Sequence, residues 1–138
     1  MKHLNIEQGV VMYYFFKFLG WVNIALLVLV ISHFILRRVN KYGFKNKGKL
    51  LRRIATSMSK VHPYIVGLLL VTAFLHGYNL AGGIRLHSGF IAFAVILLQS
   101  GFGILVKYVK KKPVLIIHRI TGLLLVVSVF IHVILMKT

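Results

Sequence analysis

Four histidines occur in two apolar stretches of this chain at the same interval. His62 and His76 are fourteen residues apart, and so are His118 and His132. On an α-helix fourteen residues rise about 21 Å and fall about 40° short of four full turns, so each pair lies on one face of its helix. Neutral imidazole is a good iron ligand, and helical bundles commonly hold cofactors between facing helices. Two such helices running parallel would therefore present two pairs of iron ligands.

The elements that must position these histidines follow from the hydropathy of the chain. Its 138 residues are 59% hydrophobic, with a mean hydropathy of +0.87, whereas soluble domains are nearer half apolar. A chain that spans lipid must form helices or a closed barrel, because only these satisfy its backbone hydrogen bonds. The period-2 alternation of barrel strands is absent from this sequence. We therefore predict an all-α integral membrane four-helix bundle, forming a single domain over residues 1–138. The expected helices span residues 10–36, 61–78, 86–106 and 113–136.

Lysines and arginines gather between the apolar segments and predict the topology. Nine lie in segment 37–60 and four in segment 107–112. The positive-inside rule places both segments in the cytoplasm and both termini outside, as in a multi-pass protein of the plasma membrane. The net charge of +17, with Glu7 as the single acid, then reflects this asymmetry, and no nucleic acid partner is expected. Segment 37–60 is expected to be a basic loop, with a turn or two of surface helix before a transmembrane helix that starts near Ser59.

In this topology the two histidine-bearing helices both begin at the cytoplasmic face and run parallel. His62 and His118 then lie at an inner level, and His76 and His132 at an outer level. A histidine inside a membrane is costly and is a functional candidate by default. We predict that each level holds one haem b, bound without covalent attachment because the chain has no cysteine. The alternative is four histidines that only form hydrogen bonds between helices.

Glycines on the third apolar segment repeat the interval. Gly89 and Gly103 are also fourteen residues apart, and glycine leaves room for the edge of a flat porphyrin. Gly67 and Gly122, about one turn past the inner histidines, are candidates for the same role. Small residues also simply allow transmembrane helices to pack closely, which is the competing explanation.

Several polar residues could serve the haem carboxylates. Arg119 and Lys60 are placed for the propionates of the inner haem and Arg85 for those of the outer haem, although such cations also pair with lipid headgroups. His87 could bind an outer propionate, accept a proton from a quinol or cap its helix. His33 is expected to be an interfacial histidine that binds no haem.

The histidine interval on two helices separated by one other resembles the haem domain of ferric reductases and NADPH oxidases. Together with the glycine spacing, it also resembles the four-helix haem core of cytochrome b in quinol-oxidising complexes. The resemblance covers residues 10–136 and implies that the inner histidine pair ligates one haem and the outer pair another. In the ferric reductase family the first histidine of each pair is cytoplasmic, as the topology predicts here. No flavin- or NAD-binding domain accompanies the core in this sequence.

The expected function is therefore electron transfer from the cytoplasmic side to an external acceptor or partner redox protein. Bis-histidine ligation leaves no open position on the iron, which favours outer-sphere transfer. Two alternatives stay open. One is an enzyme that oxidises quinol or reduces ferric iron beside the outer haem, with quinone as a further cofactor, and the other is a haem-free module whose histidines carry protons or a metal ion. A homodimer or a larger redox complex is compatible with this sequence.

Overall fold

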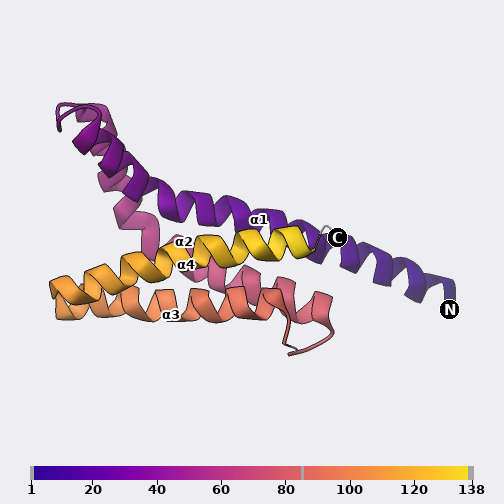
Figure 1. Cartoon of the computed structure of the whole chain (residues 1–138). Coiled ribbons are helices and arrows are strands. Elements are labelled where there is room, and N and C mark those ends of the chain that lie inside the picture. Colours follow the sequence, from indigo (N-terminus) through magenta and orange to yellow (C-terminus); the bar gives the residue numbers. More distant parts are fainter. Residues whose placement is uncertain (1, 85, 137–138) are drawn as a thin grey trace. The chain divides into compact units, whose positions relative to one another are not determined.

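A computed structural model describes the backbone of residues 2–84 and 86–136, and the side chains of residues 9–84 and 86–136. The described residues form helices and no strand, which confirms the all-α prediction (Figure 1). The four helices are α1 (Lys2–Tyr42), α2 (Lys49–Ala81), α3 (Ser88–Val109) and α4 (Lys112–Leu135).

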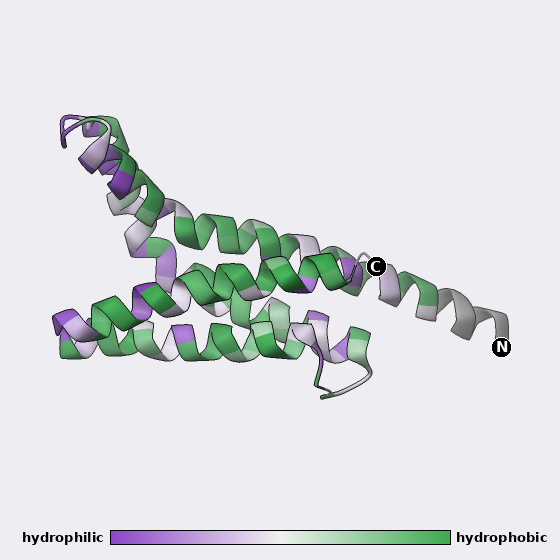
Figure 2. Ribbon diagram, viewed as in Figure 1, coloured by the Kyte–Doolittle hydropathy of each residue, from purple (hydrophilic) through white to green (hydrophobic). Residues whose placement is uncertain are grey.

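Each helix contains a stretch long and apolar enough to cross a membrane. Figure 2 shows the hydrophobic colour along most of each helix, with hydrophilic residues gathered near helix ends and connections. Large apolar side chains stay exposed on these helices, for example Trp21 at 62% and Phe130 at 66% of their surface. Such exposure is expected where lipid tails are the solvent. The chain is thus a multi-pass membrane protein with four candidate spans.

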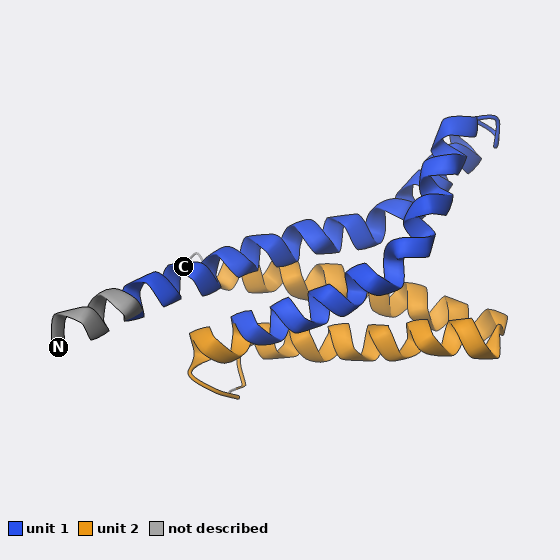
Figure 3. Ribbon diagram, turned by 180° about the vertical axis from the view of Figure 1, so that it is seen from behind, with its two compact units in different colours: residues 1–76 blue, residues 77–138 orange. Residues whose placement is uncertain are grey.

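The chain divides into two compact units, residues 1–76 and residues 77–138 (Figure 3). In the first unit α1 and α2 run antiparallel, since Asn23 bonds Thr72 while Arg37, further along α1, bonds Ser59. The second unit is built on the antiparallel pair α3 and α4. Whether the two units form one domain stays a prediction.

The predicted basic loop over residues 37–60 is mostly helical, well beyond the turn or two of helix expected before Ser59. Helix α1 continues to Tyr42 and α2 begins at Lys49, so only residues 43–48 connect them. Lysine, arginine and leucine are good helix formers, and the basic sequence therefore extends both helices beyond the apolar spans. The connection closes tightly: the Gly48 amide donates to Asn40 Oδ1 over 3.0 Å, and the Asn46 amide donates to the Asn40 carbonyl over 2.8 Å.

Helix α2 begins at Lys49 and not near Ser59, so Pro63 lies inside the helix. A proline there has no N–H to donate to the carbonyl of Ser59 and crowds it, which favours a bend. Figure 3 shows α2 bending on its course through the first unit. The bend separates the basic part of α2 from its apolar part.

Helix α1 begins at Lys2, eight residues before its predicted start, and the remaining helix ends lie within three residues of their predicted positions. Helix α2 continues to Ala81, and Gly82 and Gly83 follow with φ of 64° and 126°. Helix α3 ends at Val109, where Lys110 adopts a left-handed conformation with φ of 53°, and Pro113 lies in the first turn of α4. These are the usual signals for helix ends and starts.

Candidate functional site

His76 on α2 is held by the backbone of α1. Its Nδ1 atom lies 2.7 Å from the carbonyl oxygen of Phe16. A carbonyl only accepts hydrogen bonds, so Nδ1 carries the hydrogen and donates it. In the neutral ring the lone pair is then on Nε2, the nitrogen that a metal would bind, and the hydrogen bond sets the orientation of the ring.

Gly20 on α1 makes room for this ring. A Cβ atom on Gly20 would stand 2.8 Å from Cε1 of His76, whereas one on Gly9 would meet nothing within 4 Å. Sequence reasoning missed Gly20 because Gly9 and Gly20 do not have the fourteen-residue interval. Only the register between α1 and α2 identifies it.

His132 on α4 has an equivalent position in the second unit. Its Nδ1 atom lies 2.9 Å from Oγ of Ser88, and a Cβ on Gly89 would stand 2.9 Å from its Cε1. The same Cβ would stand 2.9 Å from Cε1 of His87. The first residues of α3 therefore surround His132 on one side with a hydroxyl, a glycine and a second imidazole.

His87 is the N-cap of α3. Its Nδ1 accepts a hydrogen bond from the Phe90 amide over 3.1 Å. An accepting Nδ1 has no hydrogen, so the neutral ring has its N–H at Nε2. Of the roles predicted for His87, the structure therefore provides the helix cap directly. The other ring nitrogen of His87, Nε2, is therefore a hydrogen-bond donor.

His118, the first histidine of α4, also faces a glycine. A Cβ on Gly103 would stand 3.3 Å from Cε1 of His118, and the Nδ1 atom of the ring is buried. Helix α3 thus supplies a glycine at the level of each α4 histidine, Gly103 for His118 and Gly89 for His132. The antiparallel run of α3 and α4 produces this match.

His62 on α2 has an aromatic contact with a second imidazole, that of His33 on α1. The rings of His33 and His62 meet edge to face, with centroids 4.8 Å apart and planes at 65°. Nδ1 of His33 lies 2.9 Å from the carbonyl oxygen of Val30 and donates to it, which holds the His33 ring on its own helix. Sequence reasoning gave His33 no contact with a ligand candidate.

A polar hydrogen bond joins the two helices of each unit between the histidine levels. In the first unit Thr72 Oγ1 donates to Asn23 Oδ1 over 2.6 Å, and in the second Thr121 Oγ1 donates to Gln99 Oε1. Gly122 accommodates the Gln99 side chain, since a Cβ there would stand 3.0 Å from Nε2 of Gln99. These bonds fix the helix register in an apolar surrounding, where a polar group is costly unless it is paired.

Four further residues were predicted from the sequence to lie near a haem: Gly67, Lys60, Arg119 and Arg85. A Cβ on Gly67 would meet nothing within 4 Å. Lys60 and Arg119 are exposed, and they lie close in sequence to His62 and His118. Arg85 lies outside the described residues. Among the described side chains, no three of the types His, Cys, Asp or Glu gather as a metal site, but a bis-histidine haem requires only two.

Each predicted ligand pair takes one histidine from each unit, so the pairing stays a prediction. Comparison with protein-family models, with curated proteins and with solved structures gives no match. The resemblance to the two haem-binding families therefore rests on the histidine and glycine spacing. The contacts around each histidine come from the structure.

Proposed function

We propose that this protein transfers electrons across a membrane through two haem b groups, each ligated by one histidine of α2 and one of α4. One observation carries the proposal. Four half-buried histidines share one interval on two apolar helices, and three of them pack against a glycine of a neighbouring helix. A side chain on those glycines would occupy space next to an imidazole.

The donor set is suited to haem iron. The hydrogen bond from His76 Nδ1 to Phe16 leaves Nε2 as the ligand nitrogen, and Ser88 can hold His132 in the same way. The chain has no cysteine, so imidazole is its strongest iron ligand. When bound, haem would supply a one-electron couple whose potential depends on its axial ligands and surroundings.

The proposed pairing is His62 with His118 at the inner level and His76 with His132 at the outer level. It is supported by the basic connections, which predict that α2 and α4 run parallel from the cytoplasmic face. The histidine levels are about 21 Å apart along each helix, most of an apolar layer about 30 Å thick. The apolar residues around them would exclude water from the route.

Residues at the two ends would orient the haem carboxylates. Lys60 and Arg119 are the candidates at the inner level, and Arg85 and His87 at the outer level. Because the Nδ1 atom of His87 is engaged by the Phe90 amide, its remaining ring nitrogen carries a hydrogen and is suited to donate to a propionate. That protonation favours the propionate role over proton acceptance from a quinol.

Haem content of the purified protein tests this function. A pyridine haemochrome assay against protein mass should give two haems per chain. A value near zero would refute the proposal and favour the haem-free module, in which the histidines carry protons or a metal ion. If haem is present, rapid reduction of it by added quinol would favour the enzymatic alternative, with quinone as a second cofactor.

A further inference from the structure

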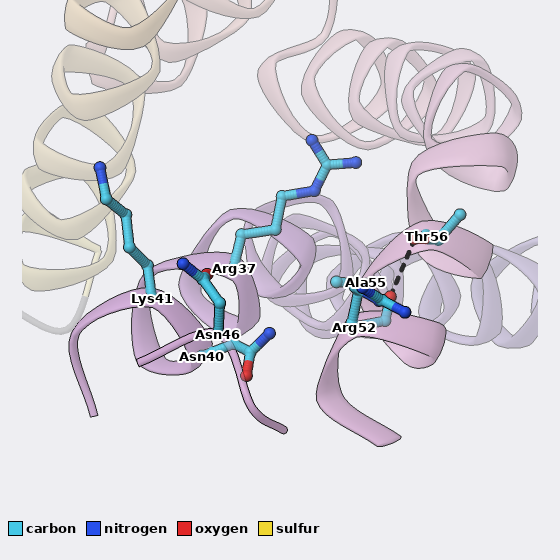
Figure 4. Close-up of a pocket in the computed structure, with 7 residues that line it drawn as sticks. All are labelled: Arg37, Asn40, Lys41, Asn46, Arg52, Ala55 and Thr56. Atoms are coloured by element: carbon cyan, nitrogen blue, oxygen red, sulfur yellow. Dashed lines mark hydrogen bonds between the residues drawn. The ribbon is translucent and has the colours of Figure 1, made fainter. Parts of the chain in front are cut away.

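The basic ends of α1 and α2 enclose a pocket in the first unit. Its volume is about 380 Å³, and it lies at the connection between the two helices (Figure 4). Three cations, two amides, a hydroxyl and a small residue line it: Arg37, Asn40, Lys41, Asn46, Arg52, Ala55 and Thr56.

The pocket carries three positive charges, and none of the side chains described in residues 9–84 and 86–136 is an acid that could neutralise them. Arg37, Lys41 and Arg52 all contribute to its wall. The single acid of the whole chain is Glu7, thirty residues before Arg37. Like charges that line one pocket repel one another, and an anion from outside the chain would relieve the repulsion. Guanidinium groups are particularly suited to the oxygens of a phosphate.

The neutral lining adds hydrogen-bond donors. Asn40 is only 5% exposed, and its Oδ1 accepts from the Gly48 amide over 3.0 Å. This bond assigns the orientation of the amide, so its NH₂ group, with two N–H donors, lies on the opposite side. A buried donor next to three cations favours an anionic ligand with several acceptor oxygens.

The surroundings of the pocket indicate a lipid and not a soluble anion. Large apolar side chains on the same connection are exposed, with Tyr42 at 65%, Phe44 at 54% and Leu50 at 69%. Cations mixed with exposed apolar groups are typical of a segment lying at a membrane surface.

The depth of the pocket agrees with this interpretation. Arg37 and Lys41 follow Leu36, the last residue of the uncharged stretch of α1, by one and five residues, which is about 1.5 to 7.5 Å of helix. The headgroup layer beyond the apolar core is about 5 to 8 Å thick on each side.

We propose that this pocket binds the phosphate of an anionic phospholipid in the leaflet that the α1–α2 connection faces. Arg37, Lys41 and Arg52 would contact the phosphate, while Tyr42 and Leu50 would lie against the glycerol and acyl chains. The site is independent of haem binding.

Lipid titration of the full chain in detergent, followed by native mass spectrometry, tests the proposal. The probes are dioleoylphosphatidylglycerol, dioleoylphosphatidylcholine and inorganic phosphate. We expect the anionic lipid to bind at least about tenfold more tightly than the zwitterionic lipid, as one charge-assisted hydrogen bond would provide. Equal binding of the two lipids would overturn the proposal, as would inorganic phosphate binding as tightly as the anionic lipid.

Two neighbouring arginines provide a matched control. Both side chains are exposed, but Arg52 lines the pocket and Arg53 does not. Arg52→Gln should weaken binding of the anionic lipid about tenfold, and Arg53→Gln by less than about threefold. Equal losses would mean that the lipid responds only to overall charge, which would refute the pocket. Arg37→Lys, which keeps the charge but loses the planar fork, should fall between Arg52→Gln and wild type.

Discussion

Gly20 is the position where one added methyl group tests the arrangement around His76 most directly. In Gly20→Ala the new Cβ would lie 2.8 Å from Cε1 of the His76 ring. Carbon atoms in ordinary contact are about 3.5 to 4.0 Å apart, so the ring must move by about 0.7 Å or more. Such a movement would lengthen the bond of 2.7 Å to the Phe16 carbonyl beyond the normal range of about 3.2 Å.

The free energy that Gly20→Ala costs around His76 is the sum of three contributions. Overpacking costs about 1–3 kcal/mol and the weakened hydrogen bond about 1 kcal/mol. Alanine is better than glycine inside a helix by about 1 kcal/mol, which offsets part of that loss. The net loss is about 1–3 kcal/mol in the arrangement that presents Nε2 of His76, which corresponds to about five- to 150-fold in affinity for the proposed outer haem.

Haem content and redox titration of purified Gly20→Ala measure this effect. We expect about one haem per chain at limiting haem, with the potential of the remaining haem little changed. Gly9→Ala is the matched control, because it lies on the same helix with nothing within 4 Å of the added Cβ, and it should keep both haems. Two haems with unchanged spectrum and potentials in Gly20→Ala would refute the reasoning.

Three further predictions concern single side chains. His76→Ala should retain one haem per chain by pyridine haemochrome. His33→Ala, which removes the ring beside His62, should retain two. Haem loss in His33→Ala would mean that the ligand assignment is wrong. Ser88→Ala should keep both haems but shift the potential of the outer one, because Nδ1 of the ligand loses its hydroxyl partner. Ser100→Ala, whose hydroxyl bonds its own helix, is the control in that redox titration, and equal shifts would contradict the prediction. Thr72→Val should lower the free energy of unfolding by about 1 kcal/mol, with haem content unchanged, and no loss in denaturant titration would show that its bond to α1 contributes little.

The four spans could be predicted from the sequence because each depends on a local property. A run of apolar residues long enough to cross lipid is recognisable without knowing its neighbours, and lipid then requires it to be helical. The same reasoning was wrong for most of residues 37–60, where high charge was taken to indicate a loop with only a turn or two of helix. High charge indicates contact with water, but it does not exclude a helix. Lysine, arginine and leucine are good helix formers whether or not they lie in a membrane.

The histidine interval, the shared face of each pair and the lack of any thiolate ligand were determined by the sequence alone, because they follow from residue types and helix geometry. Which residue meets each histidine was decided only by tertiary structure. The antiparallel register of α1 and α2 places Gly20 against His76 and His33 against His62. That register depends on the short turn at residues 43–48 and on polar bonds such as Asn23 to Thr72. Contacts of this kind join residues far apart in the chain, and no interval within one helix encodes them.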